Sequence, residues 1–337
     1  MFNKKNILVT GGTGSFGSFL VQYLAENYQP NKIIIYSRDE LKQYELQNKE
    51  FVKKNKKIFR FFIGDIRDKD RLNFAFKNNI DYVFHAAALK QVPAAEYNPF
   101  EAIKTNIIGS QNIIDAAIAN NVKKTIALST DKASSPINLY GATKLVSDKL
   151  FVAANNFKNN DSIFSVVRYG NVMGSRGSVI PHFLSKKDSN QLEITDTRMT
   201  RFNITLKEGV EFVIKCLSKS LGGEVFVPKI PSYKITDIAK AIAPKAKLKI
   251  IGIRPGEKIH EEMISSSEGM NTFEFKDYFI IFPQSQDISW GMKEFNKIHN
   301  GEKFQKKEYG FSYQSQNNKD FLSLDQIKNL IKKESYK

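Results

Sequence analysis

Residues 7–17 read ILVTGGTGSFG, a short apolar run followed by glycines at positions 11, 14 and 17. The apolar run predicts a buried strand, and the glycines lead into a helix. Gly11 allows a tight turn, Gly14 lets the backbone approach a pyrophosphate, and Gly17 lets the helix pack closely on the strand. The free N–H groups at the helix start would then face the phosphates. This stretch therefore predicts a dinucleotide-binding unit.

Further short apolar runs alternate with segments of helical periodicity through the first half of the chain. Ile107, Ile114 and Ile118, for example, share one helical face. This alternation predicts an α/β fold, a Rossmann-type doubly wound parallel sheet with right-handed crossovers. The strands that we expect cover residues 7–10, 32–36, 59–63, 82–85, 125–129, 164–168 and 225–227.

The pattern changes after Gly170, where loops rich in Gly, Ser and Pro precede shorter elements. A chain of 337 residues suggests two domains or one large domain with an added lobe, at roughly 150 residues per domain. We expect residues 1–170 to form the dinucleotide-binding domain, with 203–227 returning to it. Residues 171–202 and 228–337 would form a smaller, interleaved substrate-binding lobe.

Composition narrows the class of protein. The chain has 51 basic and 35 acidic residues, but the lysines are scattered, which favours anionic small substrates over nucleic acid. A single cysteine, Cys216, permits no intrachain disulfide, and the four histidines show no metal-ligand spacing, so we expect no metal and a cytoplasmic location. No apolar stretch reaches about 18 residues, so we expect no membrane span.

The end of the second predicted strand bears on cofactor choice. An NAD-binding protein usually has an acidic residue there for the ribose 2′-hydroxyl, whereas this chain has Ser37 and Arg38. Because a guanidinium suits a 2′-phosphate, we expect NADP. Asp39 and Glu40 follow at once, and Arg38 could instead cap a surface loop.

Tyr140 and Lys144 lie one helical turn apart on the same face. The ammonium and a cationic nicotinamide would favour the phenolate, lowering the tyrosine pKa, so that Tyr140 could take a proton from a substrate hydroxyl. The sequence STDK at residues 129–132 precedes it, at the carboxyl edge of the fifth predicted strand, where open α/β sheets place their ligands.

These motifs, with HAAALK at 85–90, resemble the extended short-chain dehydrogenases that act on nucleotide sugars. LSTDKA at 128–133, NLYGATK at 138–144 and RYGNV at 168–172 are more specifically similar to the inverting UDP-N-acetylglucosamine 4,6-dehydratases of pseudaminic acid biosynthesis. The similarity continues through GSRGSV at 174–179, MTRF at 199–202 and IRPGEK at 253–258. Retaining dehydratases have Asp-Glu where this chain has Asp131 and Lys132, so the resemblance implies inversion at C5.

The resemblance also implies roles for individual residues. Tyr140 would remove the C4 hydroxyl proton while hydride passes to NADP⁺, and Thr130 would hydrogen-bond the C4 oxygen. Lys132, made neutral by burial near Lys144, would take the C5 proton, and protonated Asp131 would give a proton to the departing C6 hydroxyl. In isolation, Lys132 could be a solvated lysine and Asp131 a turn residue.

Binding residues follow from the fold pattern and the resemblance together. For the cofactor we expect Gly11, Thr13, Gly14, Ser15, Phe16, Gly17, Ser37, Arg38, Asp39, Glu40, Leu41, Lys42, Asp65, Ile66, Ala86, Lys90, Tyr140 and Lys144. For UDP-N-acetylglucosamine we expect Lys90, Thr105, Asn171, Val172, Arg176, Val179, Thr195, Arg201, Arg254 and Glu257. A homo-oligomer is expected. The alternatives are a retaining 4,6-dehydratase or 4-epimerase of a UDP-sugar, or a non-catalytic NADP-sensing regulator.

Overall fold

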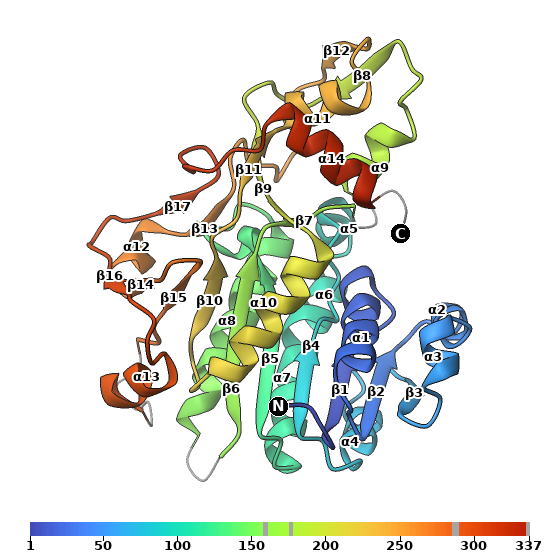
Figure 1. Cartoon of the computed structure of the whole chain (residues 1–337), viewed down its shortest axis with the longest axis vertical. Coiled ribbons are helices and arrows are strands. Elements are labelled where there is room, and N and C mark those ends of the chain that lie inside the picture. The colour runs from blue at the N-terminus through green and yellow to red at the C-terminus, as the bar shows by residue number, and fades with distance from the viewer. Residues whose placement is uncertain (158–160, 175–177, 285–289, 335–337) are drawn as a thin grey trace.

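The structure is a computed structural model that describes residues 1–157, 161–174, 178–284 and 290–334. Within these ranges, one large sheet has ten strands (Figure 1). Their spatial order is β16 (Gln305–Lys306), β14 (Thr272–Glu274), β15 (Tyr278–Ile281), β10 (Val225–Pro228), β6 (Ile163–Tyr169), β5 (Lys124–Thr130), β4 (Tyr82–His85), β1 (Asn6–Thr10), β2 (Lys32–Ser37) and β3 (Phe59–Ile63).

The strands from β10 to β3 are parallel, and β1 lies between β2 and β4. Apart from the edge strand β3, these strands are mostly buried and rich in apolar residues, as expected for strands covered on both faces. The predicted strands agree with the observed ones to within one residue at either end. This order, with the chain reversing direction across β1, confirms the Rossmann-type doubly wound fold.

Helices cover both faces of the parallel sheet. In Figure 1, α1 (Ser15–Asn27) and α10 (Leu206–Lys219) lie side by side in front of it. The helix α7 (Gly109–Ala119) contacts both α4 (Lys69–Phe76) and α8 (Leu139–Ala153). The other helical segments are α2 (Glu40–Gln47), α3 (Glu50–Lys54), α5 (Val92–Tyr97), α6 (Pro99–Ile103), the π-helix η1 (Lys104–Ile108) and the 3₁₀ turns η2 (Asp131–Ala133) and η3 (Ala154–Asn156).

Residues 272–284 and 290–306, which we grouped with the second lobe, extend the large sheet or pack against it instead. Strand β15 pairs antiparallel with β10, and β14 and β16 follow at the edge. Phe273, Phe275 and Phe295 pack ring against ring beside α13 (Met292–Ile298) and belong to the same core as the parallel strands. The aromatic area buried against the sheet explains why this segment joins it.

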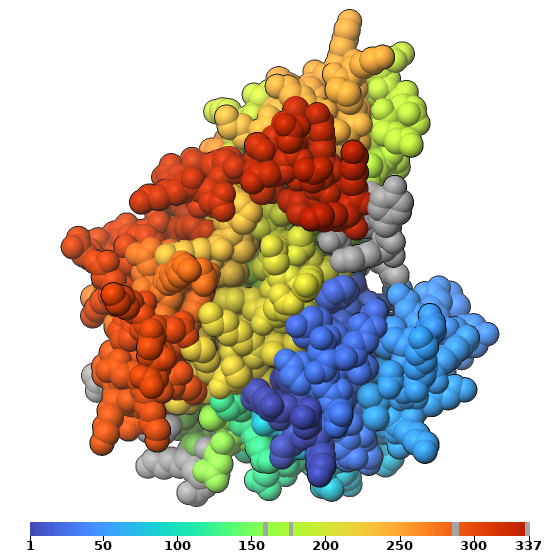
Figure 2. Space-filling view, in the orientation of Figure 1, coloured from blue at the N-terminus to red at the C-terminus, as the bar shows by residue number. Residues whose placement is uncertain are grey.

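A second lobe stands above the carboxyl ends of the parallel strands (Figures 1 and 2). It has its own apolar core, with Ile180, Leu192, Ile238 and Ile327 buried together. Its elements are α9 (Val179–Leu184), β8 (Gln191–Ile194), α11 (Ile235–Ile242), β12 (Lys247–Ile250) and α14 (Leu324–Glu334). Two small sheets join the lobes: β11 (Ser232–Lys234), β9 (Thr200–Ile204) and β7 (Asn171–Val172), and β13 (Glu262–Ile264) with β17 (Tyr313–Gln314); α12 (Ser266–Gly269) follows β13.

No helix in the described ranges has the length and apolar character that crossing a bilayer requires.

Candidate functional site

A cavity of about 1180 Å³ lies between the two lobes. It runs from the glycine loop after β1, past the carboxyl ends of β4 and β5, to residues of the second lobe such as Thr195 and Ile235. Open α/β sheets bind ligands at this edge, where the strand order reverses. This volume is above the usual range of about 300–1,000 Å³ for ligand pockets, so the cavity can hold more than one small molecule.

The glycine loop has the conformation that the sequence predicted. Gly11 has a φ of +66°, and a Cβ there would lie 2.8 Å from the backbone nitrogen of Ala87. Gly14 is the N-cap of α1, and among the described residues no side chain caps this helix. The first N–H groups of α1 therefore face the cavity, which fits the pyrophosphate of a dinucleotide.

The end of β2 forms one wall of the cavity. Ser37, Arg38, Asp39 and Lys42 line it, and Arg38 Nη1 lies 3.5 Å from Asp65 Oδ2. The Arg38 side chain therefore lies beside the cavity, where it pairs with Asp65. Ser37 is itself held by a residue that sequence analysis missed, because the buried Gln43 donates to its carbonyl and hydroxyl oxygens at 3.0 Å.

Two of the predicted cofactor residues lie elsewhere. Glu40 and Leu41 occupy the first turn of α2, and neither contributes to the cavity wall. Leu41 is 66% exposed. The other predicted cofactor residues all line the cavity, including Thr13, Ser15, Phe16, Gly17, Asp65, Ile66, Ala86, Lys90, Tyr140 and Lys144.

Thr130, Asp131, Lys132 and Tyr140 converge where β5 ends. The Thr130 hydroxyl donates to Asp131 Oδ1 at 2.9 Å and also hydrogen-bonds the Tyr140 side chain. Asn138 caps α8 by accepting from the Gly141 N–H at 2.7 Å, and this turn places Tyr140 over the strand end. The structure thus brings the predicted catalytic residues together, although Asp131 is fully buried behind the cavity wall.

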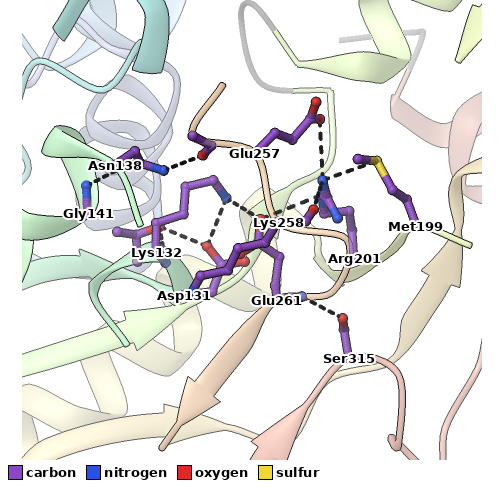
Figure 3. Close-up of polar contacts among 12 residues, drawn as sticks. Asp131, Lys132, Asn138, Gly141, Met199, Arg201, Glu257, Lys258, Glu261 and Ser315 are labelled. Atoms are coloured by element: carbon purple, nitrogen blue, oxygen red, sulfur yellow. Dashed lines mark hydrogen bonds and ion pairs between the residues drawn. The ribbon is translucent and has the colours of Figure 1, made fainter. Parts of the chain in front are cut away.

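Lys132 lies between two carboxylates, shown in Figure 3. Its Nζ is 3.0 Å from Asp131 Oδ1 and 3.0 Å from Glu261 Oε1. Burial alone would lower the pKa of Lys132, but the two carboxylates outweigh it and raise this pKa. Our expectation of a lysine made neutral by burial near Lys144 is therefore wrong for the resting pair. The alternative of a solvated lysine is also wrong, since the side chain is 24% exposed and paired on both sides.

The pKa values of Asp131 and Tyr140 are also raised. Burial raises the pKa of Asp131, which favours its protonated form. Burial also raises the pKa of Tyr140 to about 12, while Lys132 and the Thr130 hydrogen bond act against it. We expected a lowered tyrosine pKa from Lys144. In the structure, desolvation of Tyr140 outweighs the neighbouring cation. The cation that acts to lower the Tyr140 pKa is Lys132, whereas we expected Lys144.

Glu261 is the member of this cluster that sequence analysis missed. Its carboxylate is 2% exposed, and its Oε1 lies 3.6 Å from Arg201 Nε as well as 3.0 Å from Lys132. Burial alone would raise the pKa of Glu261, but Lys132 and Arg201 lower it, so the carboxylate is ionised. A signal was present, since Glu261 follows the predicted substrate loop 253–258 by three positions.

The second lobe contributes the other end of the cavity. Arg201 is 5% exposed and its Nη2 lies 3.4 Å from Glu257 Oε1 (Figure 3). Within the described residues, Glu257 Oε2 and the hydroxyl of Thr105 are buried without a hydrogen-bond partner. Such groups suit a polar ligand. The remaining predicted substrate residues Lys90, Asn171, Val172, Val179, Thr195 and Arg254 also line the cavity, whereas Arg176 lies outside the described residues.

No group of three or more His, Cys, Asp or Glu side chains within the described ranges is arranged to hold a metal ion.

Comparison with known proteins places this chain in a family. The profile of the family described as "Polysaccharide biosynthesis protein" matches residues 7–283. A UDP-N-acetylglucosamine 4,6-dehydratase (inverting) from Campylobacter jejuni is 57% identical over 334 residues, which cover 98% of each chain. A UDP-glucose 4-epimerase from Rickettsia canadensis is 40% identical over 299 residues, covering 86% of each chain.

Solved structures agree with the fold. Pen from Bacillus thuringiensis superposes with a TM-score of 0.87 at 37% identity, covering 99% of both chains. DesIV, a dTDP-glucose 4,6-dehydratase from Streptomyces venezuelae, has a TM-score of 0.66 at 20% identity, over 75% of this chain and 86% of that one. The predicted resemblance is confirmed: the chain belongs to the polysaccharide biosynthesis protein family and, within the extended short-chain dehydrogenases, to the group of the inverting UDP-N-acetylglucosamine 4,6-dehydratases.

Proposed function

We propose that this protein is a 4,6-dehydratase, which converts UDP-N-acetylglucosamine to a 4-keto-6-deoxy sugar with loss of one water and inverts C5. The product would be UDP-2-acetamido-2,6-dideoxy-β-L-arabino-hex-4-ulose, the first intermediate of pseudaminic acid synthesis for surface or flagellin glycans. The observation that supports it most is that Thr130, Lys132 and Tyr140 line one cavity together, with Asp131 buried directly behind them and 3.0 Å from Lys132. A relative that is 57% identical has the same activity in its name.

A nicotinamide dinucleotide fits the glycine loop, and we propose NADP. Gly11 and Gly14 leave room for its pyrophosphate, and Arg38 beside Asp65 supplies a cation where a 2′-phosphate would lie. When bound, the cofactor accepts a hydride from the sugar and returns it. Lys90, Tyr140 and Lys144 line the cavity farther along, between the glycine loop and the second lobe.

The proton transfers fall to residues of this chain. Tyr140, hydrogen-bonded to Thr130, accepts the proton of the C4 hydroxyl as that carbon is oxidised. The new ketone acidifies the C5 hydrogen. Lys132 passes a proton to Asp131 across 3.0 Å, which leaves a neutral amine and a carboxylic acid. Lys132 can therefore act as a base even though its pKa is raised, because it first gives its proton to Asp131.

Water is then lost across C5 and C6. The Lys132 amine takes the C5 proton, the C5–H electron pair forms the double bond, and the C6–O bond breaks as Asp131 protonates the leaving hydroxyl. The pair ends as ammonium and carboxylate, as it began. Return of the hydride to C6 by a bound cofactor would leave C5 to be protonated from the opposite face. A solvent-derived proton there balances the proton that Tyr140 took from the C4 hydroxyl and completes the inverted product.

Arg201, Arg254 and Glu257 are the residues that we propose for the UDP moiety. Arg201 is fixed by five protein acceptors, including the carbonyl oxygens of Thr200, Lys258 and Ile259, so its guanidinium is preorganised. The Thr105 hydroxyl and Glu257 Oε2, which have no hydrogen-bond partner among the described residues, would bind polar groups of the ligand. We propose that the enzyme acts in the cytoplasm as a homo-oligomer, with the exposed Tyr97 and Phe100 at a subunit contact.

Epimerisation at C4 is the second candidate, because relatives at 40% identity are named UDP-glucose 4-epimerase. That reaction returns hydride to C4 and needs no acid–base pair at C5 and C6. The buried Asp131–Lys132 pair therefore favours dehydration over epimerisation. A retaining dehydratase would have glutamate at position 132, and a sensor without catalysis has no need of Tyr140.

NMR of the product formed in D₂O tests the proposal. We expect a 4-keto-6-deoxy sugar with L-arabino configuration, deuterium at C5 and protium at the hydride-derived position of C6. Lys132→Ala should abolish both dehydration and C5 exchange, whereas Lys149→Ala, an exposed lysine of α8, should do neither. A D-xylo sugar as the first product would exclude the inverting assignment, and UDP-N-acetylgalactosamine, the C4 epimer of the substrate, would favour the epimerase.

A further inference from the structure

Three ionisable side chains meet at the cavity wall, where Lys132 and Glu261 line the cavity and Asp131 is buried behind them. Lys132 Nζ lies 3.0 Å from both Asp131 Oδ1 and Glu261 Oε1, and the two carboxylate side chains are 1% and 2% exposed. Among the described residues, their second oxygens have no hydrogen-bond partner. Two buried carboxylates are stable side by side only with a cation between them, so Lys132 is essential to this cluster.

Glu261 reaches this cluster from a distant, firmly held segment. Its backbone N–H donates to the Ser315 hydroxyl at 2.9 Å, and the Ser315 N–H donates to its carbonyl oxygen at 2.8 Å. The Ser315 hydroxyl also lies 2.7 Å from that of Thr200. Glu261 is thus anchored on both backbone groups while its side chain extends to Lys132 (Figure 3).

Other charged and titratable groups surround the triad. Arg201 of β9 lies 3.6 Å from the Glu261 carboxylate, and Lys258 lies on the loop that precedes it. Lys90, Tyr140 of α8 and Tyr233 of β11 also interact electrostatically with Lys132. Among all of these neighbours, the negative charges closest to Lys132 are Asp131 and Glu261, so removal of either changes its protonation most.

We propose that Glu261 is a positioning residue for the step at C5 and C6, holding the Lys132 amine against Asp131 so that the pair retains the single proton that the step requires. The inference rests on the proposed dehydratase function. The productive pair has one proton, as Lys-NH₂ with Asp-COOH. It is lost at low pH, when both groups are protonated, and at high pH, when neither is.

The ionised Glu261 favours the protonated form of both partners. Glu261→Gln removes this charge with little change of shape, so both limbs of the pH profile of water loss should move to lower pH, by about 1–3 units. At the wild-type optimum kcat should fall by about tenfold or more, while KM for UDP-N-acetylglucosamine stays within about twofold. Glu261→Asp retains the charge at a greater distance, so its profile should lie between the other two.

Glu262→Gln is the matched control. The neighbouring Glu262 carboxylate accepts from the hydroxyls of Ser134 and Ser135 and does not line the cavity, so its loss should leave both limbs in place. A kcat for Glu261→Gln that falls equally at every pH would overturn the inference, as would a change in KM alone. If Glu261→Gln does not fold, Glu261→Asp provides the test. Limbs of its pH profile that move to lower pH support the inference, and limbs that stay in place or move to higher pH overturn it.

A measurement without turnover separates this inference from the proposed function. In protein labelled at lysine Cε and Nζ, with Lys132 assigned through Lys132→Arg, the wild-type Lys132 signal should remain that of a charged amine up to about pH 10. In Glu261→Gln it should begin to titrate below that pH. An unchanged titration overturns the role of Glu261 even if the enzyme is active; failure to dehydrate the sugar, with the titration shifted, overturns the proposed function instead.

Discussion

Arg168 Nη2 lies 3.4 Å from Asp148 Oδ2, with the two side chains 2% and 4% exposed. Arg168 belongs to β6, and Asp148 lies on α8 two turns after Tyr140. The Ser129 hydroxyl donates to the same carboxylate at 2.8 Å, and Arg168 Nη1 donates to Glu268 at 3.1 Å. This buried network fixes the helix of Tyr140 and Lys144 to the strand that ends at Thr130.

Removing the arginine should therefore destabilise the whole protein. Arg168→Met leaves a buried carboxylate without its guanidinium, so we expect the free energy of unfolding to fall by about 3 kcal/mol or more. Urea denaturation monitored by circular dichroism measures this loss. Arg198→Met is the control, because Arg198 is 67% exposed in its pair with Asp196 and such pairs contribute under about 1 kcal/mol. Equal losses in the two variants would contradict a structural role for the buried pair.

The glycine loop can be tested by comparing two glycines with positive φ. Gly11→Ala places a methyl group 2.8 Å from the Ala87 backbone nitrogen, in addition to the strain of φ +66°. Gly252 has a φ of +87° and open space around it, so Gly252→Ala experiences only the backbone strain, about 1–2 kcal/mol. We expect Gly11→Ala to lose more stability and to stop binding the dinucleotide, measured by NADPH fluorescence. If Gly11→Ala and Gly252→Ala have similar stabilities and similar dinucleotide affinities, the glycine loop can move to accommodate the methyl group, and the prediction is wrong.

Cofactor preference should depend on Arg38. The guanidinium is 49% exposed, and its 3.5 Å contact with Asp65 holds it at the cavity. Arg38→Asp should weaken NADP binding about tenfold or more while sparing NAD, because it replaces a cation at the 2′-phosphate position by an anion. Isothermal titration with each cofactor measures this ratio. Arg60→Asp, at an exposed site on β3, should leave both affinities unchanged; a native protein that binds NAD alone would show that the assignment of NADP is wrong.

Tyr140→Phe should block oxidation at C4. Within the described residues no other phenol hydrogen-bonds Thr130, so we expect kcat to fall by about 10²–10⁴ while the ring keeps its place and UDP-sugar binding survives. Since burial raises the pKa of Tyr140 to about 12, the phenol is protonated at neutral pH in the free protein. The wild-type rate of C4 oxidation should therefore rise with pH through the neutral range.

Single-turnover absorbance of the reduced nicotinamide, recorded across pH, follows that step. Tyr44→Phe, at an exposed tyrosine of α2, is the control and should keep the wild-type rate and pH dependence. A Tyr140→Phe variant with a near wild-type rate would remove this residue from the mechanism.

The parallel sheet, its strand order and the glycine loop were predictable from the sequence. Their signals are local: buried apolar runs such as residues 7–10 have the length of a strand, and Gly11 must adopt a backbone conformation that other residues avoid. Thr130, Asp131, Lys132 and Tyr140 were predictable for the same reason, because one strand end and one helix start place them.

Only the tertiary structure decided which other residues contact this cluster and how they shift the pKa values of its members. Glu261 is 129 positions from Lys132, and no local pattern indicates that the two meet at 3.0 Å. The pKa of Lys132 rises rather than falls because Coulomb interactions depend on that distance and on burial, which composition and spacing do not determine. The same holds for strands β14 to β16, whose short sequences become part of the large sheet only through the aromatic core that they share with it.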